Sequence, residues 1–142
     1  MSKSAMTWTT SHIILRQLTD VEAESWARHR QRLDRRVPAL KPLTPSEKAL
    51  LHFFALREST KHGYAFPGRA HTAERLGCTV RTIDRKISVL ENAKLVAVTR
   101  RGGHHSSTNE YRLLVPCEIR HRDREWMSRH PCPVCGQVER TN

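Results

Sequence analysis

Apolar side chains recur at three- and four-residue spacing in three consecutive stretches near the middle of this chain. The first stretch, TPSEKALLHFFALRE, has a broad apolar side that includes Leu50 and Phe54, as expected of a helix that supports a small core. Thr44 is a suitable N-cap, Pro45 fits the first helical position, and Glu47 completes a capping box. The pattern therefore predicts a helix that begins directly after Thr44.

Two further helices follow, with only a short turn between them. The stretch RAHTAERLG predicts a short helix ending at Gly77, a residue suited to a left-handed C-terminal turn. Thr79 is placed to cap the next helix. On that helix one side is apolar, formed by Ile83, Ile87 and Leu90. Two helices joined by so short a turn must cross steeply, which is the geometry of a helix-turn-helix.

The third helix carries arginine on the side opposite its apolar cluster. A helical wheel places four polar residues on this outer side: Arg81, Arg85, Ser88 and Asn92. A solvated helix usually mixes charge signs, whereas the two charges here are both arginine. Arg81 and Arg85 lie one turn apart in the N-terminal half, where side chains of a major-groove helix reach base edges. Thr79 would bring its hydroxyl and the N-terminal amides to a phosphate.

The stretch LVAVTRRGGHHSSTNEYRLLV predicts a β-hairpin with a basic tip. Its second half alternates the apolar residues Tyr111, Leu113 and Val115, and the Gly-Gly pair suits the loop. A helix-turn-helix followed by such a hairpin is a winged helix. The wing would approach the sugar-phosphate backbone with Arg100, Arg101, His104 and His105. An exposed loop without a role is the alternative for the two histidines.

Several local features then match one known family. They are Pro67 before the second helix, Leu76-Gly77, the Arg81-Thr82-Ile83 run, Leu90-Glu91, Leu95-Val96, and an Arg-Arg-Gly-Gly wing that closes on Asn109 and Tyr111-Arg112-Leu113. On these features, residues 44–115, about half of the chain, resemble the winged helix-turn-helix domain of bacterial, phage and plasmid replication, stability and regulatory proteins. The resemblance implies base-reading positions at Arg81, Thr82 and Arg85.

Three positions depart from the family pattern. Thr72 stands where an apolar residue is usual, Gly68 where a Ser cap is usual, and Lys94 where Gly often ends the third helix. These departures predict a weaker start of the second helix.

The region before the central segment contains a basic amphipathic pattern. In TDVEAESWARHRQRLDRRV, Thr19 with Glu22 forms a capping-box pattern that starts a helix. Trp26, Leu33 and Val37 fall near one stripe of that helix, and most of its arginines lie elsewhere. The helix would pack on the main domain, pair with a second copy of the chain, or lie along phosphates.

The overall charge narrows the class of partner. The chain of 142 residues has 25 Lys and Arg against 14 Asp and Glu, a net charge of +11. Such an excess favours polyanions, with nucleic acid the commonest, an anionic membrane surface next, and an ordinary basic protein as the alternative. The sequence shows no signal peptide or membrane span, which favours a reducing cytosol for the cysteines. It also lacks a P-loop, a Ser/His/Asp arrangement and paired carboxylates, so an enzyme is not predicted.

The C-terminal region adds a candidate metal site. Cys132-Pro-Val-Cys135-Gly is a knuckle in which two thiolates converge. Cys117 with either His121 or His130 would complete a tetrahedral site for one structural zinc ion. The alternative is a reduced, metal-free pair on a mobile tail. Cys78 reads as a small buried residue.

Between these cysteines, EIRHRDREWMSRH alternates Arg with Asp or Glu. We expect a solvated helix with Trp126 and Met127 as apolar anchors; the alternative is that Arg120, Arg124 and Trp126 touch DNA or a second subunit.

Together these features predict a mainly α fold with a small β-hairpin wing. A basic leader with an amphipathic helix spans 1–42, a winged helix-turn-helix DNA-binding domain spans 43–115, and an Arg-rich tail with a zinc knuckle spans 116–142. Bases would be read by Arg81 and Arg85, with Thr82 and Ser88 nearby. Phosphates would be held by Thr79, Lys86, Arg69 and the wing residues.

The expected function is sequence-specific binding of double-stranded DNA in the cytoplasm. The resemblance implies a transcriptional repressor, or a protein that binds the replication or stability region of a plasmid or phage. The alternative is a non-specific nucleic-acid binder or an adaptor that recruits a replication or transfer protein. Whether the protein forms a homodimer is left open.

Overall fold

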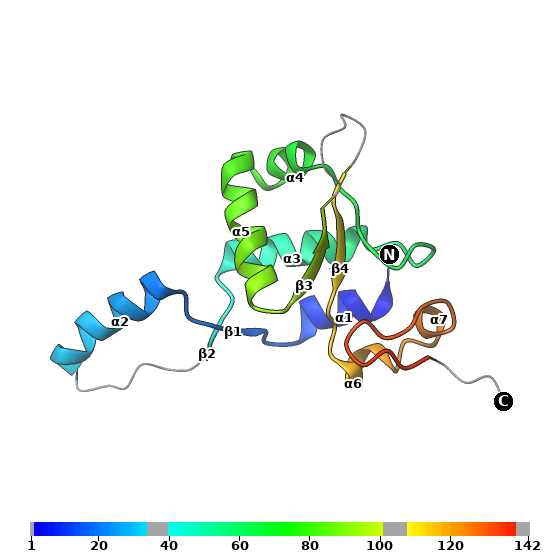
Figure 1. The fold of residues 1–142 in the computed structure, drawn as a ribbon, viewed down its shortest axis with the longest axis horizontal. Coiled ribbons are helices and arrows are strands. Elements are labelled where there is room, and N and C mark those ends of the chain that lie inside the picture. The colour runs from blue at the N-terminus through cyan, green and yellow to red at the C-terminus, as the bar shows by residue number, and fades with distance from the viewer. Residues whose placement is uncertain (1, 34–39, 101–107, 139–142) are drawn as a thin grey trace.

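A computed structural model describes residues 2–33, 40–100 and 108–138 of the chain. Figure 1 shows small helices, a β-hairpin and a short antiparallel strand pair around a central helix, with α2 (Asp20–Leu33) inserted between the two strands of the pair. The elements are α1 (Lys3–Ser11), β1 (Leu15–Gln17), α2 (Asp20–Leu33), β2 (Leu40–Pro42), α3 (Pro45–Arg57), α4 (Arg69–Leu76), α5 (Val80–Asn92), β3 (Val96–Thr99), β4 (Glu110–Leu113), α6 (Cys117–Arg120) and α7 (Arg124–Met127).

Helices α3, α4 and α5 with the hairpin β3–β4 form a winged helix body, as the sequence predicts. The hairpin is antiparallel, and its register pairs Val96 with Leu113. Ala65, in the α3–α4 connection, exchanges both backbone hydrogen bonds with Tyr111 of β4, at 2.8 and 2.9 Å. The Tyr111 ring stacks on Phe54 of α3, with centroids 4.3 Å apart. The wing is therefore anchored to the helical core through both the backbone and the ring of Tyr111.

The predicted capping signals place the helix ends. Thr44 accepts a hydrogen bond from the Glu47 N–H, and the Glu47 carboxylate accepts one from the Thr44 N–H at 3.1 Å, so the capping box of α3 is confirmed. Gly77 ends α4 in the left-handed region with φ 69°, and the Thr79 hydroxyl accepts from the Thr82 N–H at the start of α5. The turn between α4 and α5 is thus the predicted helix-turn-helix turn.

The three departures from the family pattern have local explanations. Thr72 is only 1% exposed, and its hydroxyl donates to the Gly68 carbonyl oxygen at 2.8 Å, which satisfies the buried polar group. Gly68 is the N-cap of α4 and provides no side-chain cap. Lys94 has φ 61°, so this position requires the left-handed conformation that glycine adopts at little cost.

Helix α1 was not predicted from the sequence. It begins at the Ser2 N-cap and packs along α3 and against α6. Its Ala5 and Trp8 side chains are 0% and 4% exposed and belong to the same core cluster as Phe54. The N-terminal region therefore contributes to the core of the winged helix body in addition to carrying the basic helix.

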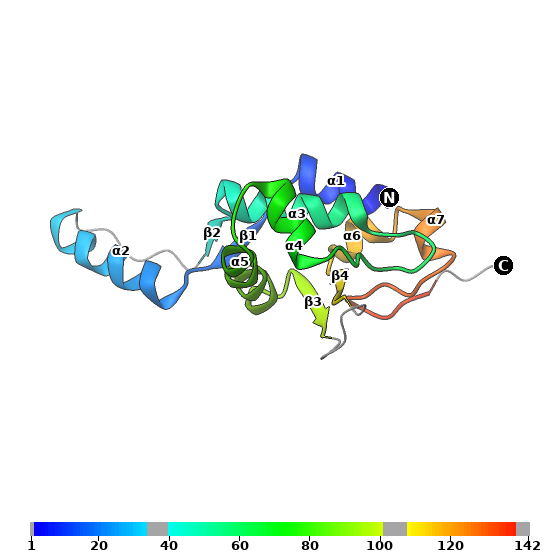
Figure 2. The same cartoon turned by 90° about the horizontal axis from the view of Figure 1, so that it is seen from above.

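Helix α2 begins with the predicted capping box, in which the Thr19 N–H donates to Glu22 and the Glu22 N–H donates to the Thr19 hydroxyl. Beyond its base the helix projects away from the body, as Figures 1 and 2 show. Val21 is 73% exposed and Trp26 37%. Beyond its base, α2 therefore does not pack on the main domain, which was one of the three arrangements that the sequence allowed.

A buried arginine fixes the base of α2. Arg16 of β1 is 3% exposed and binds Glu47 through Nε at 2.8 Å and Glu22 through Nη1 at 2.6 Å. Each of these glutamates also caps its own helix, α3 or α2. Lys41 of β2 adds a 2.8 Å contact to Glu22. One guanidinium therefore joins the first turns of α2 and α3.

A second buried arginine corrects the expectation for the tail. The solvated helix predicted between the cysteines is instead two short helices, α6 and α7, that pack on the body. Arg120 is 0% exposed and makes a bidentate ion pair with Glu58, at 2.8 and 3.0 Å. Its guanidinium lies 3.9 Å from the ring centroid of Trp126, which is itself 2% exposed. Neither residue is accessible to DNA or to a second subunit.

The same arginine connects the tail to the N-terminus. Arg120 Nη1 donates to the hydroxyls of Ser2 and Ser4 at 3.0 and 2.7 Å. Asp123 accepts from the N–H and the hydroxyl of Ser4 at 2.9 and 2.7 Å. Burial alone would raise the pKa of Asp123, but these hydrogen bonds lower it overall. This network closes the core around α1, α3 and α6.

Candidate nucleic-acid interface and metal centre

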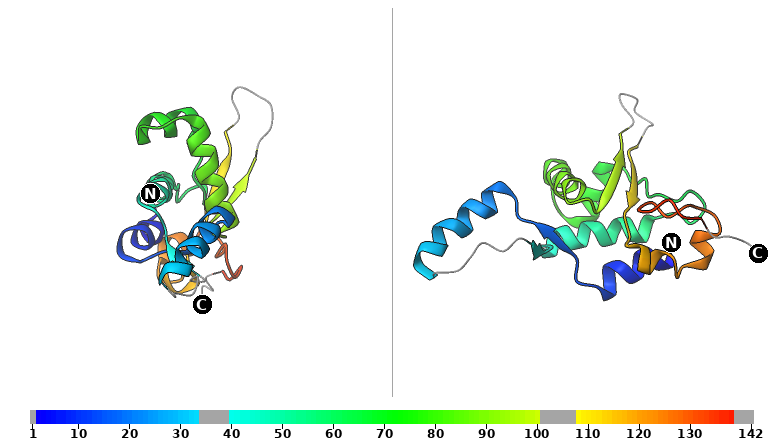
Figure 3. Two further views of the ribbon diagram at one scale, coloured as in Figure 1. Left: turned by 90° about the vertical axis from the view of Figure 1, so that its left-hand side faces the viewer. Right: turned by 60° about the horizontal axis from the view of Figure 1, so that its bottom comes forward.

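The outer face of α5 is polar and exposed. Ile83, Ile87 and Leu90 are at most 5% exposed, while the opposite side presents Arg81, Arg85, Ser88 and Asn92 to solvent. This is the division that the helical wheel predicts. Figure 3 shows α5 lying beside the two strands of the wing on the surface of the body.

The two arginines of this face remain available to an external anion. Neither Arg81 nor Arg85 forms an ion pair with a described residue. The Ser88 hydroxyl donates to the Asp84 carbonyl oxygen within the helix at 3.1 Å. An arginine without an internal carboxylate retains all of its donors for a phosphate or a base edge.

Two other predicted contact residues are held by acidic partners. Arg69, at the start of α4, binds both carboxylate oxygens of Asp84 on α5, at 3.0 and 3.1 Å. Arg100, after β3, makes a bidentate pair with Glu91 of α5, with both contacts at 2.9 Å. The Arg100 hydrogen bond lowers the pKa of the Glu91 carboxyl, and Glu91 raises the pKa of Arg100. Sequence reasoning did not predict these pairs, which brace α5 against α4 and the wing.

The remaining predicted contacts lie near these groups or outside the described residues. The hydroxyls of Thr79 and Thr82 are 3.0 Å apart at the start of α5. Lys86 is half-buried, and its charge contributes to the lowered pKa of Glu47. The wing residues Arg101, His104 and His105 lie outside the described residues.

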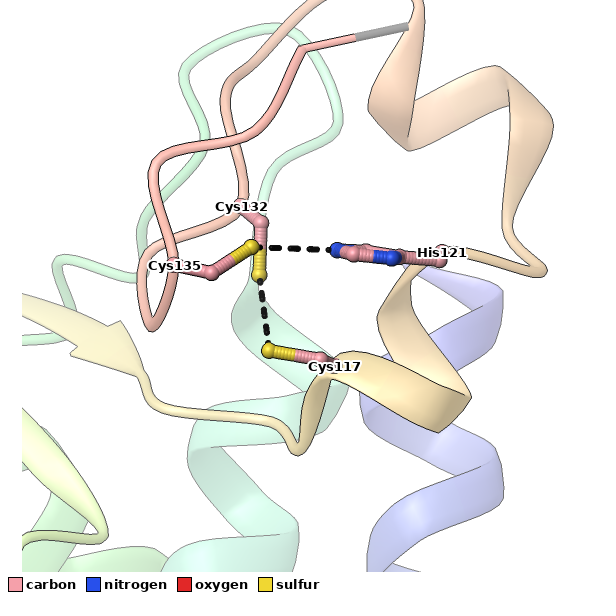
Figure 4. Close-up of side chains that lie close together, drawn as sticks. All are labelled: Cys117, His121, Cys132 and Cys135. Atoms are coloured by element: carbon pink, nitrogen blue, oxygen red, sulfur yellow. Dashed lines mark hydrogen bonds between the residues drawn. The ribbon is translucent and has the colours of Figure 1, made fainter.

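The second candidate site is a cluster of three cysteines and one histidine. Cys117 and His121 come from α6 and its C-cap, and Cys132 and Cys135 come from the knuckle that follows α7 (Figure 4). Their ligand atoms all lie within 4.8 Å of one another. The fold therefore brings together the three predicted cysteines and one of the two candidate histidines, His121, as a site for one metal ion.

The distances within the cluster suit a tetrahedral zinc ion. With Zn–S bonds of about 2.3 Å, two sulfurs on one tetrahedron stand about 3.8 Å apart. The Sγ atoms of Cys117 and Cys132 are 3.8 Å apart, and His121 Nε2 lies 3.3 Å from Cys135 Sγ. Thiolates with one imidazole are ligands that zinc favours. Since four protein ligands fill the tetrahedron, the site fits structural rather than catalytic zinc.

The knuckle backbone favours the thiolate form of one ligand. Burial would raise the pKa of Cys132, but the N–H groups of Cys135 and Val134 point at its sulfur and lower the pKa to about 7. Gly136, with φ 73°, permits the tight turn, and its N–H donates to the Cys132 carbonyl oxygen at 2.7 Å. Burial, followed by its neighbouring thiols, raises the pKa of Cys117 to about 11. Cys132 is thus more readily deprotonated for metal binding than Cys117.

The alternative ligand His130 has a different role. Its Nε2 lies 2.6 Å from the Thr60 carbonyl oxygen in the α3–α4 connection. Its ring is also tilted against Trp126 and packs closely on Gly63. A Cβ added to Gly63 would lie only 2.9 Å from Nδ1 of His130. His130 therefore packs the tail against the body, and His121 is the histidine of the cluster.

The fold and the cluster define a winged helix protein with a candidate metal centre in its tail. No protein family's sequence model matches the chain, and no curated protein matches it. Among solved structures it is similar to PerR from Streptococcus pyogenes, a protein of peroxide sensing and gene regulation. The identity is 16% over 91% of this chain and 73% of that chain, with a TM-score of 0.38. This likeness is too low to support an argument about this chain.

Among residues 2–33, 40–100 and 108–138, none of the helices has the length and apolar character that a membrane span requires.

Proposed function

We propose that this chain is a sequence-specific double-stranded DNA-binding protein that inserts α5 into the major groove. The observation that carries the proposal is the division of α5 into a buried apolar side and an exposed side whose arginines have no described ion-pair partner. In a major-groove helix, such arginines bind the O6 and N7 atoms of guanine with two parallel hydrogen bonds.

In this proposal, Arg81 and Arg85 read bases, with Thr82 and Ser88 beside them. Thr79 and the N-terminal amides of α5 hold a phosphate, and Lys86 adds positive charge nearby. Arg69 and Arg100 remain proposed phosphate contacts. Because each already binds a carboxylate of α5, a phosphate would have to share or displace that carboxylate. We therefore expect each to contribute less than an unpaired arginine.

The metal centre has a structural role in the proposal. When bound, zinc would tie α6, directly after the wing, to the C-terminal knuckle through Cys117, His121, Cys132 and Cys135. The site stands apart from the exposed face of α5, so the metal would act on DNA binding only through the stability of the tail.

For the biological role, the resemblance favours repression of transcription or binding to the replication or stability region of a mobile element. Either role requires discrimination between DNA sequences, which distinguishes both from a non-specific binder or an adaptor for a replication or transfer protein. An enriched sequence gives the target, and the spacing of its half-sites gives the number of copies bound.

The test is selection of the purified protein on a randomised duplex library, followed by titration of the enriched and scrambled duplexes. We expect one motif with an affinity ratio of about a thousandfold or more over scrambled DNA. Arg81→Ala and Arg85→Ala should each cost about 1 to 3 kcal/mol on the enriched duplex and much less on scrambled DNA.

Arg122→Ala, in the exposed tail, is the matched control, because it removes the same charge away from α5. Equal losses on both duplexes would mean that Arg81 and Arg85 contact phosphates, and the base-reading assignment would be wrong. Steep salt dependence on every duplex without enrichment would leave only counterion release and favour the non-specific alternative.

A further inference from the structure

Helix α2 carries its charges in two separate parts. Its first half contains Asp20, Glu22 and Glu24, whereas residues 25–33 contain Arg28, Arg30 and Arg32 and no acidic residue. The first half lies next to the body and the second half projects from it (Figures 1 and 2). The part of the helix that is farthest from the body is therefore positively charged.

The base of this helix is fixed by its buried contacts. Glu22 is engaged by Arg16 and Lys41, so its charge is neutralised inside the clamp that also holds Glu47 of α3. Two bidentate carboxylate contacts on one buried guanidinium set a defined geometry, because the planar fork admits few orientations. The direction in which α2 leaves the body is thus set by the body itself.

The base of α2 also adjoins the candidate DNA-binding helix. A hollow of 270 Å³ is lined on one side by Thr19 and Asp20 and on the other by Val89 and Asn92, near the C-terminal end of α5. From there α2 extends on the side of α5 opposite the wing strands, as both Figure 1 and Figure 2 show. The basic helix, α5 and the wing therefore follow one another across the molecule.

We propose that α2 binds the sugar-phosphate backbone of duplex DNA beside the segment contacted by α5. This inference rests on the proposed function and extends it by a second contact region. The charge of residues 25–33 is complementary to a polyanion, and a helix of 14 residues is about 21 Å long. At about 3.4 Å per base pair, it would lengthen the protected segment by roughly six base pairs.

A second copy of α2 is a less suitable occupant. Residues 25–33 of α2 are called the arm. Pairing the arms of two chains would bring Arg28, Arg30 and Arg32 of one chain near those of the other, and like charges at short range oppose such pairing. The environment of Arg28 favours an external partner, since its side chain is 77% exposed and its contact with Glu24 is long, at 3.9 Å.

The experiment compares the full-length triple variant Arg28→Gln, Arg30→Gln, Arg32→Gln with the wild type on a duplex of random sequence. Affinity is measured over a range of salt concentrations. Each lost phosphate contact should lower the slope of log affinity against log salt by about 0.9, so we expect a reduction of roughly 2 to 3. The matched control is Arg122→Gln, Arg124→Gln, Arg129→Gln, which removes the same charge from exposed tail positions and should leave the slope close to the wild-type value.

A slope unchanged in the arm variant, or lowered equally in the tail control, would overturn the inference. It would also be overturned if sedimentation showed a wild-type dimer that the arm variant converts to monomers, because α2 would then pair two copies. Circular dichroism and the thermal midpoint confirm that both variants are folded. On the enriched duplex, nuclease protection should shorten by about six base pairs while the ratio of specific to scrambled affinity is retained.

Failure of the inference can be separated from failure of the proposed function. A selective loss in Arg85→Ala with an unchanged arm slope rejects only the role of α2. A reduced arm slope without any selective loss in Arg81→Ala or Arg85→Ala supports α2 as a phosphate-binding arm and rejects base reading by α5. If the wild type binds neither the random duplex nor any enriched duplex, both proposals are rejected.

Discussion

Arginine has opposite environments in two regions of this molecule. Arg16 and Arg120 are 3% and 0% exposed and bind glutamate through their guanidinium groups, Arg16 two glutamates and Arg120 one, whereas Arg81 and Arg85 lie on the surface of α5. All four contribute equally to the net charge of +11. The comparison shows that the charge available to a polyanion depends on burial and partners, which a count of basic residues does not reveal.

The difference has a physical cause. Removing a guanidinium from water is costly unless a carboxylate and further acceptors replace the lost hydration. Arg120 has Glu58, two serine hydroxyls and the Leu113 carbonyl oxygen as acceptors. An exposed arginine keeps its hydration and exchanges it for a phosphate or a base only on binding. The buried arginines should therefore affect stability, and the exposed ones should affect binding.

The largest expected effect on stability comes from breaking the buried ion pair between Arg120 and Glu58. Arg120→Met leaves the fully buried Glu58 without its partner, and we expect a loss of about 3 to 5 kcal/mol in the free energy of unfolding. Arg85→Met removes the same charge from the surface and should change stability by less than about 0.5 kcal/mol. Urea unfolding followed by circular dichroism measures both.

The double variant Arg120→Met, Glu58→Gln separates the ion pair from simple loss of packing. Neutralising Glu58 removes the buried unpaired charge, so the double variant should recover part of the loss. Equal destabilisation by Arg120→Met and Arg85→Met would mean that burial does not distinguish the two classes of arginine.

Removal of the metal should have a smaller effect, confined to the same end of the molecule. Cys117 and His121 flank Arg120 on α6, so loss of zinc should loosen the tail and leave α5 protected from hydrogen exchange. With free zinc at roughly 100 times its dissociation constant, chelation should lower stability by about 2.7 kcal/mol.

Cys132→Ser and Cys78→Ser are the matched pair for this prediction. Cys132 belongs to the cluster, whereas Cys78 packs against the hydrophobic core outside it. Metal analysis should give one zinc per chain in Cys78→Ser and a marked loss in Cys132→Ser. If the two variants hold the same amount of zinc, the cluster is not the metal site.

The helical part of the fold could be predicted because its signals are local. A capping box, a left-handed glycine and apolar spacing lie within a few residues of the helix ends that they define, and Thr44, Gly77 and Thr79 all function as expected. Helix α1 could not be predicted in this way. Its apolar residues are few, and its burial depends on α3 and on contacts between Ser4 and Asp123, 119 positions apart.

The candidate sites show the same distinction. The metal cluster combines two local motifs, a Cys-x2-Cys knuckle and a Cys-x3-His pair, so its three cysteines could be identified before the fold was known, and the fold decided between His121 and His130. The carboxylate partners of Arg69 and Arg100 were not predicted, because each pair joins two elements whose packing the sequence pattern does not specify. The same reason applies to Arg120, whose partner Glu58 is 62 positions away.

The smallest of these effects is expected at the Arg16 clamp, as a dependence of stability on acid pH. Hydrogen bonds from Arg16, opposed in part by burial, lower the pKa of Glu22, and Lys41 lowers it further. Burial would raise the pKa of Glu47, but Arg16, the Thr44 N–H and Lys86 of α5 together lower it overall. Because both carboxyl groups have lower pKa values in the folded state, their contribution is present above the ordinary value of 4.5 and is lost as pH falls below it.

The measurement is the free energy of unfolding of the wild type and of Glu22→Gln across acid and neutral pH. The wild type should be more stable by on the order of 1 to 2 kcal/mol near neutrality, since each unit of pKa shift corresponds to about 1.4 kcal/mol and water screens this partly exposed group. Loss of zinc at low pH acts on both proteins and cancels in the difference. A difference that stays constant below pH 4.5 would show that Glu22 contributes by packing or by its helix cap rather than by its charge, and the arm would then lack an electrostatic clamp at its base.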